Sequence, residues 1–191
     1  MTVGQRPAGK KRLLDRVALV TGASRGIGRG IAESLGGEGA HVALAARSSS
    51  DLTEIAGEIR KGGSKALAVT CDLTQQQDIE NTVQSTLDEF GRVDFLINNA
   101  GVGLRGKVDE LSVEKWDEMM AINLRAVFLM TRAVVPQMRS QGGGHIVNIS
   151  SVAGLVGNPG LSAYNASKFG LMGFSEATML ELRHKWLLNA S

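Results

Sequence analysis

RVALVTGASRGIG, the stretch at residues 16–28, decides the fold of this chain. It opens with an apolar, β-rich run at 16–20, which predicts a short buried strand. A turn with the spacing G-x-x-x-G-x-G follows, formed by Gly22, Gly26 and Gly28. From residue 26 onward apolar residues recur at helical spacing, so the turn leads into a helix. Glycines let a phosphate approach the backbone and the helix N-terminus offers N–H donors, so the pattern predicts a dinucleotide site.

Strands and helices alternate along the rest of the chain. We predict further strands at residues 41–46, 65–70, 93–98 and 146–150. We predict further helices at residues 51–61, where Asp51 is the N-cap, and at 75–90, 112–138 and 164–183. The strands are continuously apolar, which is typical of a parallel sheet covered on both faces. Five β-α units predict an α/β fold of Rossmann type, a three-layer, doubly wound parallel sheet of order 3-2-1-4-5 with a ligand crevice at the strands' carboxyl ends.

Length, composition and charge are those of one domain. The chain has 191 residues, of which 43% are hydrophobic, and this is enough to bury a single core. The net charge is only +2, so the overall balance indicates neither a nucleic-acid partner nor a membrane surface. Positive charge is concentrated near the N-terminus. We therefore expect residues 1–14 to form a flexible basic tail and residues 15–191 to form a single dinucleotide-binding domain.

The cysteine, histidine and apolar patterns exclude several other classes of protein. Cys71 is the only cysteine, so we expect neither an intrachain disulfide nor a cysteine metal site, and the chain suits a reducing cytoplasm. The three histidines lack ligand spacing, and we expect no metal. No run approaches the roughly 18 apolar residues of a membrane span, so we expect no membrane.

The end of the second predicted strand bears on the choice of dinucleotide. That strand runs into Arg47 and Ser48, with no carboxylate to accept a hydrogen bond from a free 2′-hydroxyl. Arg47 and Arg25 instead offer positive charge and forked donors that suit a 2′-phosphate. NADP(H) is therefore favoured over NAD(H). The alternative is that both arginines are exposed loop charges.

A second informative stretch, at residues 150–168, carries candidate chemical groups. Tyr164 is the only tyrosine, and Lys168 follows it four residues later. On a helix this spacing puts both side chains on one face, where the positive charge of the lysine favours the ionised phenol. Ser151 lies at the end of the fifth predicted strand. Hydride transfer at a carbonyl carbon needs one proton donor or acceptor at the oxygen, and Tyr164 is suited to that role.

Five motifs occur together in the order typical of a known enzyme family. They are TGASRGIG at residues 21–28, NNAG at 98–101, Asn123, NISS at 148–151 and YNASK at 164–168. In this set the sequence resembles the short-chain dehydrogenase/reductase family, over roughly residues 15–183. The resemblance implies an NADP(H)-dependent oxidoreductase that interconverts a secondary alcohol and a ketone or a 3-oxoacyl thioester.

The resemblance also implies roles for particular residues. The implied catalytic set is Ser151, Tyr164, Lys168 and Asn123. In this set tyrosine is the general acid/base, serine orients the substrate oxygen, lysine also holds the ribose hydroxyls, and asparagine holds a water in a proton path. The implied cofactor-binding residues are Gly22, Ser24, Arg25, Gly26, Ile27, Gly28, Arg47, Ser48, Asp72, Leu73, Asn99, Ala100, Gly101, Tyr164 and Lys168. Among them, Asp72 is implied to contact the adenine. Taken singly, each could be an ordinary cap, turn or surface residue.

The expected partners are a small carbonyl or alcohol substrate and further copies of the chain. The predicted helices at 112–138 and 164–183 carry more apolar positions than one buried face needs. In the family these two helices pair across a two-fold axis, which implies a homodimer or homotetramer.

The sequence departs from the family after Lys168. Family members continue with a sixth and a seventh strand, and neither is visible here, so we expect a C-terminally incomplete domain. The fifth strand would then be an exposed apolar edge. The alternative function is therefore a catalytically inactive or weakened nucleotide-binding fragment, or a partner of a full-length reductase. The sequence does not distinguish between substrate types.

Overall fold

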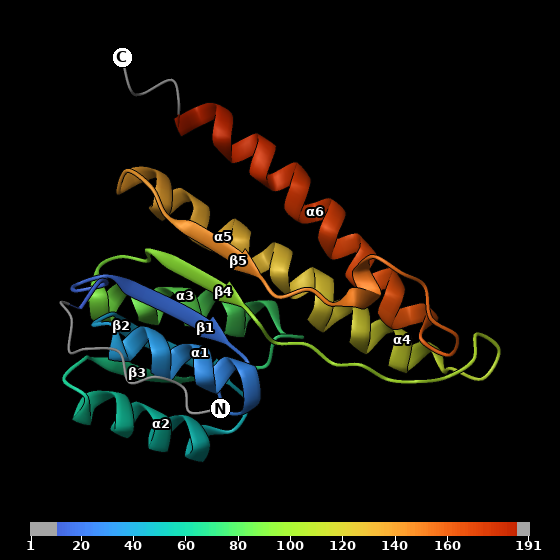
Figure 1. The fold of residues 1–191 in the computed structure, drawn as a ribbon, viewed down its shortest axis with the longest axis horizontal. Helices are drawn as coiled ribbons and strands as arrows, with labels where there is room; N and C mark the ends of the chain where they lie inside the picture. The colour runs from blue at the N-terminus through green and yellow to red at the C-terminus, as the bar shows by residue number, and fades with distance from the viewer. Residues whose placement is uncertain (1–10, 187–191) are drawn as a thin grey trace, which may run out of the picture.

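A five-stranded parallel sheet forms the centre of the molecule, as the computed structural model of residues 11–186 shows (Figure 1). The strands are β1 (Val17–Thr21), β2 (His41–Ala46), β3 (Ala66–Thr70), β4 (Phe95–Asn98) and β5 (His145–Asn148). The helices are α1 (Gly26–Gly37), α2 (Ser49–Lys61), α3 (Gln76–Phe90), α4 (Val113–Met120), the π-helical turn η1 (Ala121–Arg125), α5 (Ala126–Ser140), the 3₁₀ turn η2 (Val152–Gly154) and α6 (Ser162–Trp186). The strand order is β3-β2-β1-β4-β5, which confirms the predicted fold class.

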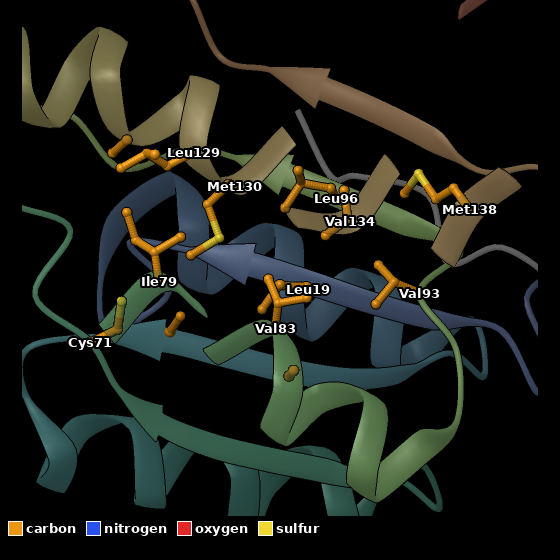
Figure 2. Close-up of a cluster of buried hydrophobic side chains, with 13 residues drawn as sticks. Leu19, Cys71, Ile79, Val83, Val93, Leu96, Leu129, Met130, Val134 and Met138 are labelled. Atoms are coloured by element: carbon orange, nitrogen blue, oxygen red, sulfur yellow. The ribbon is translucent and has the colours of Figure 1, made fainter. Parts of the chain in front are cut away.

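Two apolar cores lie on the two faces of the sheet. The first joins the strands to α3 and α5 and contains Leu19, Ile79, Leu96, Met130 and Val134 (Figure 2). The second joins the strands to α1 and α2 and contains Val20, Ala32, Leu44, Leu52 and Ile55. Because β1 and β2 are buried on both faces, they read as continuous apolar runs rather than alternating ones. The two cores together fix the strands between the two helix layers, with their carboxyl ends along one edge of the sheet.

The amino ends of β1 and β4 are tied together by a buried carboxylate. Asp94 accepts hydrogen bonds from the backbone N–H of Val17 at 2.9 Å, from Nη1 of Arg16 at 2.9 Å, and from Nε and Nη2 of Arg92 at 2.8 and 2.7 Å. Its side chain is only 7% exposed. Burial alone would raise the pKa of Asp94, but the hydrogen bonds from Arg92, Val17 and Arg16 outweigh it and lower the pKa below 3.8.

The longest apolar helix runs through α4, η1 and α5. By length and composition alone it could cross a membrane, with a mean hydropathy of 1.3 in a window that is half buried. Its buried side chains, among them Met130, Val134 and Met138, pack into the first core. Packing against the sheet therefore explains its apolar composition.

Several predicted boundaries or environments differ in the structure; β4, for example, begins at Phe95 rather than at residue 93. Helix α2 begins at Ser49 with Ser48 as its N-cap, so Asp51 lies inside the first turn rather than at the cap. Strand β5 ends at Asn148, and its residues alternate between exposed and half-buried positions. Among residues 11–186 it pairs only with β4, so one edge of β5 is open.

The described part of the predicted tail contacts the domain. Residues 12–15 form a turn in which the N–H of Leu13 donates to the carbonyl of Glu38 at 2.9 Å. Arg12 forms an ion pair with the Glu38 carboxylate at 2.9 Å. Residues 1–10 of the predicted tail lie outside the described residues.

Candidate active site

The glycine turn leaves a backbone cradle between the carboxyl ends of β1 and β4. Gly22 has a φ of +64°, and a Cβ atom there would lie 2.8 Å from Cα of Ala100. A Cβ atom on Gly28 would overlap the carbonyl oxygen of Gly22 and lie 2.5 Å from Nδ2 of Asn99. Side chains at these two positions would clash with these atoms, so the local geometry requires glycine.

Hydrogen bonds lock this turn to the loop after β4. Asn99 Nδ2 donates to the carbonyl oxygens of Thr21 and Gly22, at 3.0 and 3.3 Å. In return the Thr21 hydroxyl oxygen accepts the backbone N–H groups of Asn99 and Ala100, at 3.1 and 3.2 Å. The two loops that would face a dinucleotide are therefore fixed relative to each other.

A cavity of about 480 Å³ opens at this edge of the sheet. Eleven of the predicted cofactor residues line it: Gly22, Ser24, Arg25, Ile27, Arg47, Ser48, Asp72, Leu73, Asn99, Ala100 and Gly101. Gly26 and Gly28 belong to the turn but not to the lining, and neither do Tyr164 and Lys168. The lining combines small residues such as Gly22, Ala100 and Gly101 with the longer side chains of Arg25 and Arg47, a combination that suits an extended, phosphate-containing ligand.

The lining of the cavity carries balanced charge. Arg25 and Arg47 line it together with Asp51 and Asp72. The backbone N–H and the hydroxyl of Thr74 each donate to Asp72 at 2.9 Å and lower its pKa, and the charge of Arg47 lowers it further. Asp72 is therefore a carboxylate at neutral pH and can accept hydrogen bonds from a ligand.

Lys168 is buried beside Tyr164. The lysine is 4% exposed, and its Nζ lies 5.9 Å from the centre of the Tyr164 ring and donates to the carbonyl of Ile149 at 2.9 Å. Burial disfavours the ammonium and lowers the pKa of Lys168 below 10.5. The predicted pair is thus brought together on one face of α6.

The segment after β4 connects this pair to the cavity. Gly101 lines the cavity, and a Cβ atom on it would lie 3.7 Å from Nζ of Lys168. A Cβ atom on Gly103 would lie 3.5 Å from the Tyr164 ring. Lys168 therefore lies beside a residue of the cavity lining, and Tyr164 lies beside the residue that follows the lining in the sequence.

Asn123 lies in the π-helical turn η1 and is 1% exposed. Its Oδ1 accepts the N–H of Val102 and its Nδ2 donates to the carbonyl of Val102, both at 2.8 Å. Nδ2 also donates to the hydroxyl of Ser167 at 3.0 Å. The side chain thus joins the segment after β4 to α6, while its predicted role in holding a water stays a prediction.

Ser151 follows β5 and begins the turn η2. Its Oγ accepts the N–H of Ala153 at 3.2 Å, so the serine caps that turn. A hydroxyl that accepts one hydrogen bond retains its own hydrogen for donation. Its chemical role stays a prediction.

The chain is similar to known proteins along most of its length. The sequence pattern of the short chain dehydrogenases matches residues 16–187. The protein belongs to the short-chain dehydrogenase/reductase family. This dehydrogenase is 40% identical to a 3-oxoacyl-[acyl-carrier-protein] reductase of Synechocystis over 171 residues, which are 89% of this chain and 69% of that protein. It is 36% identical to human dehydrogenase/reductase SDR family member 4, over 89% of this chain and 62% of that protein.

Two solved structures share the fold of this short-chain dehydrogenase/reductase. A metagenomic short-chain oxidoreductase in complex with NADP is 43% identical, with a TM-score of 0.87 over 90% of this chain and 78% of that one. An NAD⁺-bound xylitol dehydrogenase is 34% identical, with a TM-score of 0.87 over 91% of this chain and 67% of that one. The family is one of oxidoreductases that act on alcohol or carbonyl groups.

Sequence reasoning missed five residues that line the cavity of this dehydrogenase/reductase: Ala46, Asp51, Cys71, Val102 and Ile122. Four of them are direct neighbours of predicted site residues, so adjacency in the sequence could have found them. The sequence predicted Asp51 as an N-cap. Because α2 begins earlier, at Ser49, Asp51 lies in its first turn, where it lines the cavity. Burial raises the pKa of Cys71, so its thiol stays protonated at neutral pH.

Proposed function

We propose that this chain is an NADP(H)-dependent oxidoreductase that interconverts a secondary alcohol and a ketone or a 3-oxoacyl thioester. One observation carries the proposal: Gly101, which lines the cavity, lies beside Lys168, and Gly103, two residues further on, lies beside the Tyr164 ring. A dinucleotide held in that cavity would end beside the only phenol in the chain.

The residues of the cavity fit a dinucleotide phosphate. The close packing at Gly22 and Gly28 brings the N-terminus of α1 up to the carboxyl end of β1, where its N–H groups would hold a pyrophosphate. Arg25 and Arg47 would hold a 2′-phosphate, and the solved NADP complex at 43% identity supports this choice. Asp72 and Leu73 would contact the adenine, and Lys168 the ribose beside the nicotinamide.

When bound, the nicotinamide ring supplies or accepts the hydride. The Tyr164 phenol donates a proton to the carbonyl oxygen in reduction and removes it in oxidation. Ser151 donates a hydrogen bond to the same oxygen and stabilises the charge that develops there. Lys168, anchored on the carbonyl of Ile149, directs its positive charge at the phenol.

The substrate class rests on the names of the relatives and on the surface beside the site. Curated relatives include 3-oxoacyl-[acyl-carrier-protein] reductases, and a solved relative is a xylitol dehydrogenase. The segment between Ser151 and Tyr164 exposes three aliphatic side chains: Val152, Leu155 and Val156. An apolar surface at this place favours a substrate with an alkyl or acyl chain over a polyol.

We also propose that copies of the chain associate in the cytoplasm. A groove between the α4–α5 helix and α6 is lined by apolar side chains that include Met120, Leu124, Phe128 and Phe174. These belong to the two helices predicted to form a homodimer or homotetramer. A lone, buried Cys71 fits a reducing compartment.

A second candidate function is nucleotide binding without turnover, as a partner of a complete reductase. The open edge of β5 and the exposed Phe169, Met172, Met179 and Leu180 of α6 favour it. These surfaces are expected to be covered in an active enzyme, because large exposed apolar patches mark interaction sites.

Titration of the purified chain with NADPH and NADH, followed by a turnover assay with ketones and 3-oxoacyl thioesters, tests both candidates. We expect tighter binding of NADPH, and Arg47→Leu to weaken NADPH about tenfold with little effect on NADH, because a hydrogen-bonded charge is lost. Arg139→Leu, on the far end of α5, is the matched control. Equal affinities for both nucleotides would contradict the cofactor assignment, and binding without turnover would favour the second candidate.

A further inference from the structure

The segment at residues 152–161 separates two of the proposed catalytic groups. Ser151 precedes it, and Tyr164 lies in the first turn of α6, which follows it. Apart from the short turn η2, the segment contains no regular secondary structure, and three of its aliphatic side chains are more than half exposed. Neither a helix nor a strand ladder therefore fixes the distance between Ser151 and Tyr164.

One buried side chain holds this segment. Asn165, the residue after Tyr164, is 8% exposed. Its Nδ2 donates to the carbonyl of Ala153 at 2.6 Å and to the carbonyl of Val156 at 2.7 Å. Its Oδ1 accepts the N–H of Asn158 at 3.0 Å. Both amide donors and one acceptor position are thus used on the segment, at three different residues.

The contact with Ala153 links the two ends of the segment. The N–H of Ala153 donates to Oγ of Ser151 at 3.2 Å, while its carbonyl accepts from Asn165. A continuous series of hydrogen bonds therefore runs from the Ser151 hydroxyl through Ala153 to Asn165. Because Asn165 adjoins Tyr164 on α6, any shift of this amide moves the serine relative to the phenol.

Backbone contacts on both sides of Asn165 also hold the segment 152–161 close to α6. The N–H of Asn165 donates to the carbonyl of Leu161 at 2.7 Å, at the start of α6. On the other side, Gly154 lies so close to α6 that a Cβ atom there would be 3.0 Å from the carbonyl of Lys168. The segment is thus pressed against α6 at η2 and bonded to it by Asn165.

We propose that Asn165 is a positioning residue that holds the segment 152–161 on α6 and thereby sets Ser151 opposite Tyr164. The proposal rests on the proposed function for its effect on the reaction, whereas the clamp itself is a property of the fold. Asn165 acts through Ser151 and does not touch the nucleotide cavity, whose lining does not include it.

Asn165→Ala tests the proposal, with Val83→Ala as a matched control. Val83 lies on the buried face of α3 in the first core and is far from residues 152–161 in the sequence, so its truncation lowers stability without touching the segment. For Asn165→Ala we expect kcat per folded molecule to fall about 10- to 100-fold, because small misplacements of a catalytic group are that costly. We expect the Kd of this variant for NADPH to stay within about twofold of that of the unsubstituted chain, since the substitution should affect only the chemical step. Val83→Ala is expected to retain kcat per folded molecule.

Asn165→Asp supplies a pH signature. The carboxylate keeps the acceptor for the Asn158 N–H but sets an oxygen against the two carbonyls that the amide held. Protonation restores one donor, so we expect kcat of this variant to recover as the pH falls, relative to the unsubstituted chain at the same pH. A constant ratio across pH would contradict donation by this side chain.

Amide hydrogen exchange of the chain with saturating NADPH separates the clamp from the reaction. Peptides within residues 151–161 are expected to exchange faster in Asn165→Ala than in Val83→Ala, while peptides of α1 and β1 are unchanged. Normal exchange and normal kcat in Asn165→Ala would overturn the proposal. If the unsubstituted chain shows no turnover with any carbonyl, the proposed function fails, and the exchange experiment alone decides the clamp.

Discussion

Single residues decide what can enter the cavity. The turn after β1 has to admit a ligand to its backbone, and two glycines make this possible by different means. Gly22 adopts a left-handed backbone, whereas Gly28 lies against the carbonyl of Gly22 and the Asn99 amide. Gly30, two residues further along α1, has no heavy atom within 4 Å of an added Cβ. The three positions look alike in the sequence but differ in what they permit.

Substitution of these glycines by alanine should therefore have opposite effects. Gly28→Ala forces the turn apart, and we expect it to lower the free energy of unfolding by about 1–3 kcal/mol and to abolish NADPH binding. Gly30→Ala, the matched control, should raise stability by roughly 0.5–1 kcal/mol, because alanine loses less entropy in a helix. Urea denaturation and nucleotide titration measure both. Normal NADPH affinity in Gly28→Ala would show that the cradle does not hold the phosphates.

The sequence predicted which of these residues lie close together because their pattern is local. The turn at residues 21–28 and the Tyr164–Lys168 pair each lie within a few positions, so the spacing itself brings their side chains together. The hydrogen bonds of Asn123 to Val102 and of Asn165 to Ala153 cross loops of irregular structure. Such partners depend on how the loops pack, and no periodicity predicts them.

At the scale of elements, the strands are joined at both ends by side chains. Asn99 and Thr21 join the carboxyl ends of β1 and β4, next to the cavity. Asp94 joins the amino ends of the same two strands, with Arg16 and Arg92 around it. The central pair of strands is therefore fixed by polar contacts at the site and, independently, away from it.

The contact at the amino ends should be lost in acid. The folded-state pKa of Asp94 lies below its unfolded value of 3.8, so its stabilisation is present above that pH and disappears as the pH falls through the folded-state pKa. We expect Asp94→Asn to lower the free energy of unfolding by about 1–2 kcal/mol at neutral pH, since both arginines are partly exposed. The difference between the two proteins should shrink toward zero in acid.

Urea denaturation across this pH range measures the effect. Glu110→Gln removes the exposed ion pair with Lys107 and should change stability by less than about 0.5 kcal/mol at any pH. A pH-independent loss in Asp94→Asn would assign the effect to packing rather than to the carboxylate.

The order and type of the elements were predictable from the sequence, whereas one helix start and one irregular turn were not. All five strands and the helices between them follow from apolar runs broken by glycine and polar turns. The predicted start of α2 was wrong by a few residues because Ser48 and Asp51 are both good capping residues. The π-helical turn at Asn123 has no sequence signature, since its apolar neighbours fit an ordinary helix equally well.

At the scale of the whole molecule, two apolar surfaces of residues 11–186 are uncovered on the side of the sheet opposite β3. One is the open edge of β5, where Val147 is 42% exposed. The other is the groove between the α4–α5 helix and α6, where Phe128 and Phe174 stack edge to face with ring centres 6.3 Å apart. Each surface offers a different mode of association, by backbone pairing at the edge or by side-chain packing in the groove.

Charged substitutions separate these two modes. If copies associate through the helices, Phe128→Asp should reduce the sedimenting mass to that of the monomer, because a carboxylate cannot be buried in an apolar interface. Val147→Lys should leave that mass unchanged and reduce aggregation, since charge on an edge strand opposes further pairing. Analytical ultracentrifugation at several concentrations reads both. An unchanged mass for Phe128→Asp, with a monomer for Val147→Lys, would place the interface at the sheet edge.

The π-helical turn Ala121–Arg125 changes the number of residues that the long helix uses in one turn. The N–H of Ala126 bonds to the carbonyl of Ala121, five residues back, so one residue more than α-helical geometry needs is accommodated there. Deleting one residue of the turn would restore regular α-helical bonding and leave the later part of the helix facing nearly the same way, because the π turn holds its extra residue within a single helical turn. Met130, Val134 and Met138 would stay in the core, whereas Asn123 would lose its place beside Val102 and Ser167. The turn therefore sets the position of Asn123 without changing the face that the rest of the helix presents to the sheet.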